Sequence, residues 1–498
     1  MFFISNFAEN SPKAQAGLNM MIIKEMFVKR EYIGRKFTGL FMPALLVLFA
    51  TFACGAQNSE GSDKYGRYLK ETGSTKPAYA IFTNPAENCT TNMNVSWVTP
   101  PGKLWEIELT DVATGETFIY DYDETLGEGN AESRNSSNGK QYKFPFSYRC
   151  ETFNEIPSKL GDRTSVTEKH IFDKHGLELY DLEPDKEYTY RIVTFDHVDG
   201  KKEYSDVHRF KTAGAKAWKA AVISDFHHYA PIWSRIESAM GMLDMINNKA
   251  GGFDWVLSPG DQTAHGASFN FWTQLAEQPN YKNFMWASVQ GNHDHMASNK
   301  KTSDNFFRDS HFFPYNGYQG QEGIAYWFKY GDVLFLMLNN EAMGASANLE
   351  KAKLWMENVV AENPSKYIVV VEHYNWLSGM TGSDLQLGRF YQTFDKLGVD
   401  LAISGHNHVY LRTAPLKAKQ PVAPEEGTVY IVAPSSDNER GREMKSPPSN
   451  GDLIKKRWTE GGRTVGGMLM DVNPNRIEMT LYNRNGTVID SFTVPAKR

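Results

Sequence analysis

Five short segments rich in histidine and aspartate follow one another in the second half of the chain. They are Asp225-Phe-His227, Gly260-Asp261, Gly291-Asn292-His293-Asp294, Glu372-His373 and Gly405-His406-Asn-His408. Imidazole nitrogens and carboxylate oxygens are the ligands that zinc, manganese and iron take from proteins. Two such ions, roughly 3.5–4 Å apart, can activate a water molecule and neutralise the oxygens of a phosphoryl group. The segments therefore predict a two-metal hydrolytic site.

Apolar runs precede most of these segments and predict the strands that position them. The runs cover residues 220–224, 255–257, 284–289, 333–338, 367–371 and 401–403. Apolar residues at helical spacing from 232 to 243 and the segment 348–361 predict intervening helices. Alternating strands and helices indicate an α/β domain, in which ligands bind beyond the carboxyl ends of the strands. Five strand ends can thus bring their polar side chains to one place.

The segment before this region has a different pattern, with short alternating strands and turn residues between them. These strands are predicted at 93–98, 105–109, 117–122, 188–195 and 208–211, and they indicate a β-sandwich. Residues 123–168 are polar and without apolar periodicity, so we interpret them as an insertion of unassigned structure. Further strands at 428–433, 467–472, 476–482 and 488–494 are placed in the α/β domain, as a second sheet or its edge.

The ordered segments resemble those of the calcineurin-like metallophosphoesterases and, among them, the purple acid phosphatases. Gly405-His-Asn-His-Val-Tyr-Leu-Arg-Thr413 matches the G-H-x-H-x-Y-x-R-T stretch of the latter family. Asn94-Val-Ser-Trp-Val-Thr-Pro100 resembles the start of its N-terminal fibronectin-type sandwich, and Gly427-Thr-Val-Tyr-Ile-Val432 resembles its late strand. The resemblance implies an α/β fold, a four-layer α/β/β/α sandwich, with an N-terminal all-β fibronectin-type sandwich domain.

The sequence patterns also indicate domain boundaries. A signal peptide or lipoprotein signal would occupy residues 1–56 and a linker residues 57–78. A fibronectin type III-like domain with the polar insertion would span 79–213, and the metallophosphoesterase catalytic domain 214–498.

A role for each site residue follows from the same resemblance. The first metal would be held by Asp225, His227 and His408, and the second by Asn292, His373 and His406, with Asp261 bridging the two. His293 would stabilise charge on the phosphate and protonate the leaving oxygen, and Asp294 would orient His293 through a hydrogen bond. The nucleophile would be a metal-bound hydroxide.

Two departures from the purple acid phosphatase pattern affect the metals. The family has a tyrosine ligand three residues after the bridging aspartate, where this chain has Ala264, and it lacks the histidine that stands here as His227. One ligand is exchanged for the other. Because the phenolate gives the family its colour and its preference for ferric iron, we predict a colourless enzyme with two ions of iron, zinc or manganese.

The expected function is that of an exported phosphatase that hydrolyses phosphate monoesters of small molecules. A phosphodiesterase or nucleotidase on the same metal core is the alternative, as is a sandwich-based binding protein with a vestigial metal domain. With a net charge of −6, a pI of about 6.1 and no long basic block, the sequence does not suggest a nucleic-acid partner.

Export is predicted from the N-terminus, where basic residues between 24 and 36 precede an apolar stretch at 40–52. Cys54, followed by Gly-Ala-Gln-Asn-Ser, resembles a bacterial lipoprotein processing site; cleavage after Gly55 and a retained membrane anchor are the alternatives. We therefore expect a periplasmic protein or a lipoprotein of the outer membrane. Cys89 and Cys150 either form a disulfide or remain two buried thiols.

Several residues beside the motifs have two interpretations. His228, His265 and His295 are structural or contact the substrate, and aromatic residues belong to the core or line a pocket. The aromatic residues are Tyr229, Trp233, Trp272, Tyr374, Trp376 and Tyr410. The basic segment 440–457 is either a solvated loop or a mobile loop over the site that attracts anions.

Overall fold

A computed structural model describes residues 76–121, 145–157, 165–196, 199–214, 217–229, 232–296, 306–437, 439–444 and 446–498 of the 498-residue chain. The predicted signal, its Cys54 and residues 57–75 of the predicted linker lie outside the described residues. So do residues 123–144 and 158–164 of the predicted insertion and the side chain of Cys150.

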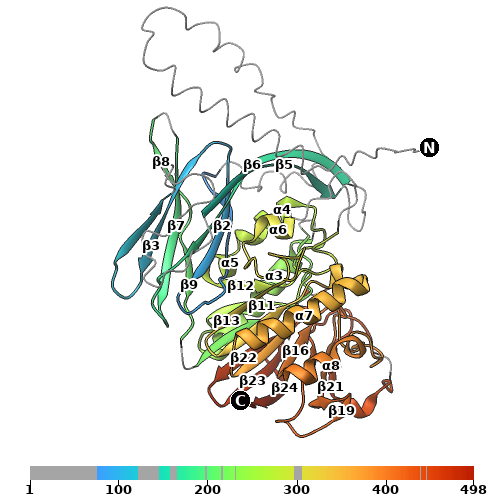
Figure 1. Ribbon diagram of the computed structural model, residues 1–498. Helices are drawn as coiled ribbons and strands as arrows, with labels where there is room; N and C mark the ends of the chain where they lie inside the picture. The colour runs from blue at the N-terminus through green and yellow to red at the C-terminus, as the bar shows by residue number, and fades with distance from the viewer. Residues whose placement is uncertain are drawn as a thin grey trace, which may run out of the picture. The chain divides into compact units, whose positions relative to one another are not determined.

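The first sheet of the α/β region combines strands from the beginning of this region with strands from its C-terminal part (Figure 1). Its order is β12-β11-β10-β22-β23-β24. The strands are β10 Trp218–Val222, β11 Trp255–Ser258, β12 Met285–Ser288, β22 Gly466–Asn473, β23 Arg476–Asn483 and β24 Val488–Pro495. The first three are parallel, whereas β22 pairs antiparallel with β10. The predicted C-terminal strands 467–494 therefore extend, on the β10 side, the sheet that carries the first three metal motifs.

The second sheet has the order β13-β14-β15-β16-β20-β17-β21. Its strands are β13 Tyr326–Tyr330, β14 Val333–Met337, β15 Tyr367–Val371, β16 Leu401–Ser404, β17 Tyr410–Thr413, β20 Val429–Val432 and β21 Ile454–Trp458. Four neighbours in its centre, from β14 to β20, are parallel. Strands buried on both faces read as continuous apolar runs, which is why these were predictable from sequence.

Alternate side chains of β15 point into two different cores, which shows how the sheets and helices are layered. Val369 and Val371 belong to the core that contains Val222 and Val256 of the first sheet. Ile368 and Val370 belong to a second core, formed with helices α7 Ser346–Glu362 and α8 Leu387–Leu397. Helix α3 Ser234–Ala250 packs on the first sheet through residues of the first core. The order of layers is helix, sheet, sheet, helix, and the predicted fold class is confirmed.

Two antiparallel sheets make up the N-terminal region. One has the order β1-β2-β6-β5 and the other β4-β3-β7-β8, with β9 also paired to β7. The strands are β1 Tyr79–Pro85, β2 Met93–Thr99, β3 Leu104–Asp111, β4 Thr117–Asp121, β5 Pro145–Pro157, β6 Ser165–Leu179, β7 Glu187–Phe195, β8 Lys202–Tyr204 and β9 His208–Lys211. Trp97 of β2 meets Trp105 of β3 edge to face, 4.9 Å between ring centroids, so the sheets face each other.

The structure assigns strands to parts of the polar segment that the sequence left unassigned. Strands β5 and β6 form a long hairpin in register from Pro145–Leu177 to Pro157–Ser165. Apart from β6, no other strand among the described residues pairs with β5, which is the edge of its sheet. Strand β6 lies between β2 and β5, but the apolar residues of Ser165–Leu179 do not alternate regularly with its polar ones and give no clear period-2 signal.

The N-terminal region shares its core with the first sheet of the α/β region. The Asn94 amide donates to the carbonyl of Phe312 at 2.9 Å, and the Ser96 hydroxyl donates to the carbonyl of Ser310 at 2.8 Å. Tyr79 of β1 and Met285 of β12 belong to one apolar cluster. A domain boundary at residues 213 and 214 stays a prediction.

The buried thiol of Cys89 is free, which favours the unpaired alternative for this cysteine. It contacts Met285, with 3.9 Å between the sulfur atoms.

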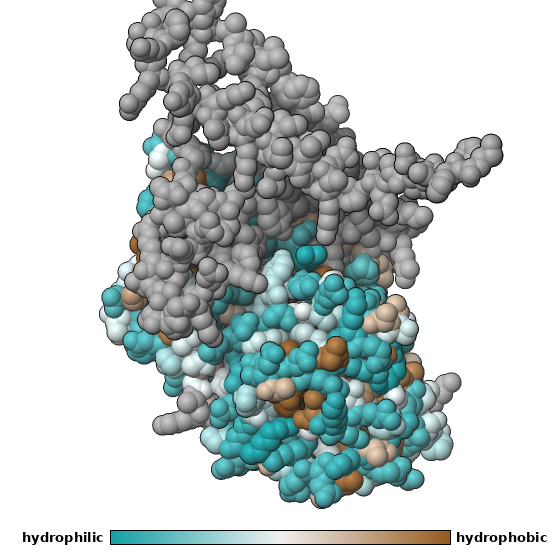
Figure 2. Space-filling view, viewed as in Figure 1, coloured by the Kyte–Doolittle hydropathy of each residue, from teal (hydrophilic) through white to brown (hydrophobic). Residues whose placement is uncertain are grey.

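Apolar side chains are mostly directed into the layers. The described surface in Figure 2 is largely hydrophilic, with hydrophobic residues in small separate groups. Within the described part of the chain, no helix combines the length and the apolar character needed to span a bilayer.

His311 links both regions and makes stability depend on pH. Its ring stacks on Phe313 and lies against Phe82 of β1, and burial lowers its pKa from 6.5 to about 3. Because the unfolded chain binds a proton here that the folded protein excludes, the free energy of unfolding falls as pH drops below 6.5.

The free energy of unfolding of the wild type should decrease on going from pH 7.5 to pH 5. We predict that this decrease is smaller by about 2 kcal/mol in His311→Asn, measured by urea denaturation of chelator-treated protein. His295→Asn, which removes an exposed imidazole, is the control and should keep the wild-type pH dependence. An unchanged dependence in the His311 variant would contradict the buried, neutral state of this ring.

Candidate metal centre

Side chains from five strand ends meet where the two sheets lie next to each other. Asp225 and His227 follow β10, Asp261 follows β11, Asn292 follows β12, His373 follows β15, and His406 and His408 follow β16. Their carboxylate and imidazole atoms form two groups, each within 4.8 Å: Asp225, His227, Asp261 and His408, and Asp261, His373 and His406. Asp261 is common to both groups, as a bridging ligand must be.

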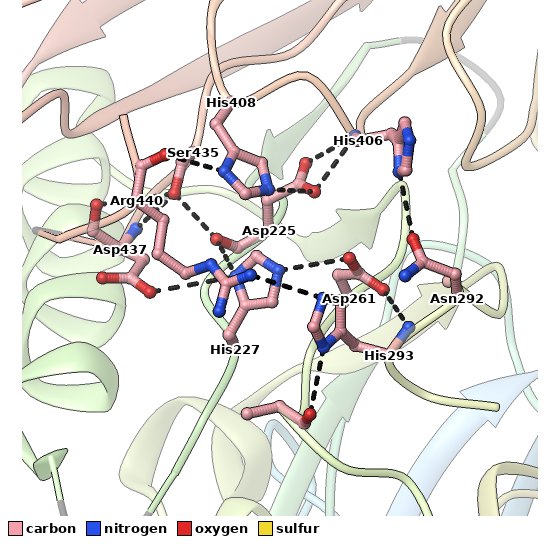
Figure 3. Close-up of polar contacts among 12 residues, drawn as sticks. Asp225, His227, Asp261, Asn292, His293, His406, His408, Ser435, Asp437 and Arg440 are labelled. Atoms are coloured by element: carbon pink, nitrogen blue, oxygen red, sulfur yellow. Dashed lines mark hydrogen bonds and ion pairs between the residues drawn. The ribbon is translucent and has the colours of Figure 1, made fainter. Parts of the chain in front are cut away.

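The distances within the groups are those of ligand atoms that face one point. In the first group, Asp261 Oδ2 lies 3.1 Å from His227 Nε2, and Asp225 Oδ1 lies 3.4 Å from His408 Nε2. In the second group, Asp261 Oδ2 lies 3.3 Å from His373 Nε2. Asn292 completes this group, because its Oδ1 is 3.0 Å from His406 Nδ1 and 3.1 Å from His373 Nε2 (Figure 3).

Backbone carbonyls fix the imidazoles so that one nitrogen of each faces the centre. His227 Nδ1 lies 2.8 Å from the carbonyl of Asp225, and His373 Nδ1 lies 2.9 Å from that of Pro259. His408 Nδ1 lies 2.7 Å from the carbonyl of Arg440. A ring that donates from Nδ1 presents the lone pair of Nε2, which is the state a metal requires.

The electrostatics of the site favour cations. Burial would raise the pKa of Asp225, but the hydrogen bond and charge of His408 bring it to about 2. Burial also opposes ionisation of Asp261, yet the charge of His373 and its contacts with His227 and His373 hold its pKa well below the ordinary value. In the second group, His406 Nδ1 also faces His373 Nε2 at 3.3 Å. Two carboxylates and converging lone pairs are a donor set that fits two divalent ions.

The backbone at these positions is bent into the left-handed region. Five of the seven ligand residues have positive φ: Asp225 (54°), His227 (43°), Asp261 (54°), His406 (70°) and His408 (60°). Residues other than glycine adopt this conformation rarely, at a cost of roughly 1–3 kcal/mol each, and it is found mostly at functional sites. The bends turn consecutive side chains of one loop toward a single centre.

His293 and Asp294 do not interact as predicted. The His293 ring places Nδ1 at 3.0 Å from the carbonyl of Ala264 and Nε2 at 3.4 Å from Arg440 Nη2. Asp294 instead accepts hydrogen bonds from the backbone N–H groups of Thr263 and Gly291. The predicted bond from Asp294 to His293 was therefore wrong: the carboxylate joins the two motif loops, and a carbonyl orients the ring.

The other histidines beside the motifs do not belong to the two groups. His228 is buried and places Nε2 2.7 Å from Oε1 of Gln274, which supports its structural interpretation. His265 is buried and His295 is exposed.

Among the aromatic candidates, Tyr374 lies beside the site, 4.7 Å from the His406 ring, and its hydroxyl donates to Glu341. Trp272 and Trp376 are buried in the two cores, and Tyr410 bonds Asp490.

Other residues, which the sequence patterns did not single out, hold the backbone around the first ligand group. Arg235 of α3 pairs with Asp437 at 3.3 Å, and the Ser435 hydroxyl donates to the carbonyl of Asp225. Both contacts depend on the loop after β20, which sequence patterns alone do not place beside β10. Arg440 was noted only as part of a basic loop, and its backbone now appears in the hydrogen bond to His408.

Gly291 must be glycine because the bridging carboxylate occupies the space of a side chain. A Cβ at this position would lie 2.2 Å from Asp261 Oδ1 and 2.4 Å from Asp261 N. We predict that Gly291→Ala reduces bound metal from two ions to one or none, measured by elemental analysis after metal loading.

Gly241→Ala is the matched control, because a Cβ on this exposed position of α3 meets nothing within 4 Å. That variant should keep its metals and gain stability of about 0.5–1 kcal/mol. Full metal content in the Gly291 variant would contradict the close approach described above.

Comparisons with known proteins agree with this geometry. Residues 218–410 match the family model of the calcineurin-like phosphoesterases, a range that contains all nine predicted site residues. A purple acid phosphatase from yellow lupin (Lupinus luteus) seeds is similar in structure, with a TM-score of 0.63, 14% identity, and coverage of 84% of this chain and 74% of that one. PhoD is similar with a TM-score of 0.52 and 12% identity, over 84% of this chain and 94% of that one. A search of curated protein sequences gave no match. Residues 218–410 therefore form a calcineurin-like phosphoesterase domain.

Proposed function

We propose that the protein is a metal-dependent hydrolase of phosphate esters, with phosphomonoesters of small molecules as substrates. The observation that carries the proposal is the shared carboxylate of Asp261, which belongs to both ligand groups. Two adjacent ions supply Lewis acidity, which activates water and neutralises the phosphoryl oxygens. The similarity in fold to a purple acid phosphatase supports monoesters, and iron, zinc or manganese all suit the ligand set.

The residues of the chain would divide the work as follows. The seven ligands hold the ions, and Asp294 keeps the loops of Asp261 and Asn292 together through Thr263 and Gly291. His293 stands beside the bridging residue, since its N–H donates to Asp261 Oδ1 at 2.8 Å. Its Nε2 is then placed to exchange a proton with the leaving oxygen, as an acid–base group requires.

Export belongs to the same proposal. The basic residues, the apolar stretch 40–52 and Cys54 support a periplasmic or lipid-anchored protein. The predicted lack of colour is supported by Ala264, whose place in the loop offers a carbonyl to His293 and no phenolate.

Hydrolysis of p-nitrophenyl phosphate and bis-p-nitrophenyl phosphate, with and without chelator, tests the activity. We predict chelator-sensitive turnover with a higher kcat/KM for the monoester. Faster hydrolysis of the diester would instead support a phosphodiesterase. The absence of chelator-sensitive turnover on both esters would support a binding protein and end the hydrolase proposal.

His293→Ala should keep both metals and lose about 10²–10⁴ in kcat, the usual contribution of an acid–base group. His295→Ala, which removes an exposed imidazole two residues away, is the matched control and should retain activity. Elemental analysis of both variants separates a chemical loss from a loss of metal. Unchanged kcat in the His293 variant would refute its assigned role.

A further inference from the structure

Arg440 lies in the loop after β20 and is tied to the metal centre at two points. Its carbonyl accepts the hydrogen bond from His408 Nδ1 at 2.7 Å, and its Nη2 lies 3.4 Å from His293 Nε2. In Figure 3 the guanidinium extends past His227 toward His293. Because a guanidinium only donates, Nε2 of His293 must be the acceptor in this contact. The hydrogen bond to the Arg440 carbonyl fixes the backbone from which the side chain starts, and the guanidinium reaches His293 from that point.

The charge of Arg440 has no carboxylate partner at ion-pair distance within the described part of the chain. By contrast, Arg235 of α3 contacts two carboxylates of this loop, Asp437 at 3.3 Å and Glu439 at 3.5 Å. Arg412 is likewise neutralised, by Asp490 at 2.7 Å. Asp437, Asp261 and Asp225 act on its charge only from beyond ion-pair distance, and a partly buried guanidinium without a direct carboxylate partner is stabilised when an anion binds to it. Arg440 is thus set apart from the other arginines near the centre.

We propose that Arg440 binds a non-ester oxygen of the substrate phosphate and makes the site selective for monoesters over diesters. This inference rests on the proposed hydrolase function and names its substrate class. A phosphomonoester has three non-ester oxygens and two charges, and a diester has two such oxygens and one charge. When bound, the two ions would neutralise non-ester oxygens in either case. The third position holds an anionic oxygen in a monoester, which a planar guanidinium binds well, and an ester group in a diester, which it does not.

The contact between Arg440 and His293 would change when phosphate binds. An arriving phosphate draws the guanidinium onto its own oxygen, because a charge-assisted hydrogen bond is stronger than one to a neutral imidazole. Nε2 of His293 then faces the leaving oxygen without a competing donor. Arg440 acts here as a substrate-binding residue, and His293 keeps the acid–base role.

The test uses the full-length, metal-loaded protein with Arg440→Met, Arg440→Lys and, as matched control, Arg442→Met. Arg442 is an exposed arginine of the same loop. We expect Arg440→Met to weaken binding of inorganic phosphate in calorimetry by about 10- to 100-fold, the loss of one charge-assisted bond. Its kcat/KM for p-nitrophenyl phosphate should fall by a similar factor and that for bis-p-nitrophenyl phosphate by less than about 3-fold. Arg440→Lys should recover part of the loss, and Arg442→Met should match the wild type.

Three outcomes overturn the inference: unchanged phosphate binding in Arg440→Met, an equal loss on both esters, or a loss of metal in elemental analysis of that variant. A loss of metal would mean that Arg440 stabilises the metal centre and does not bind the substrate. Failure of the hydrolase proposal looks different, because the wild type would then turn over neither ester. Phosphate binding still tests Arg440 in that case, since it needs no turnover.

Discussion

Seven candidate ligand side chains, two of them buried carboxylates, are packed into one small volume, and this crowding is the constraint on which the rest of the structure depends. Asp225 and Asp261 are buried carboxylates, and the Nδ1 atoms of His227 and His373 face backbone carbonyls, so that Nε2 of each ring is directed to the centre. Without cations such an arrangement loses free energy through desolvation and repulsion. The protein holds it in place by backbone geometry, with left-handed residues at five ligand positions. Glycines allow the loops to approach, as at Gly405, where a Cβ would lie 2.6 Å from Asp225 Oδ2.

Most of the α/β fold was predictable from sequence because its strands are buried on both sides. The run Tyr367–Val371 contains only apolar residues and Tyr, and the structure shows all five side chains buried between two layers. The metal ligands were predictable for a related reason. A polar residue directly after such a run leaves the core at the strand end, where the neighbouring strand ends also lie. His373, two residues after β15, illustrates the rule.

What the sequence did not reveal depends on backbone contacts over long distances. The His293 ring was expected to bond Asp294, its neighbour in sequence, yet its partner is the carbonyl of Ala264. The orientation of His408 depends on the carbonyl of Arg440 in the same way. Carbonyl groups are present at every residue, so no side-chain pattern can single one out. The β6 strand of this hairpin escaped prediction because its buried apolar residues Phe172, Leu177 and Leu179 do not keep a regular period-2 spacing among the polar ones.

Strand β10, which leads into Asp225, has its antiparallel partner β22 at Gly466–Asn473, nearly at the other end of the chain. A ribosome must therefore synthesise almost the whole polypeptide before the edge of β10 can be covered. Until then, the nascent sheet exposes unpaired N–H and C=O groups, which invite aggregation or the binding of a chaperone. Termination between His408 and Gly466 leaves a product that contains every candidate metal ligand but lacks the strands that close the sheet.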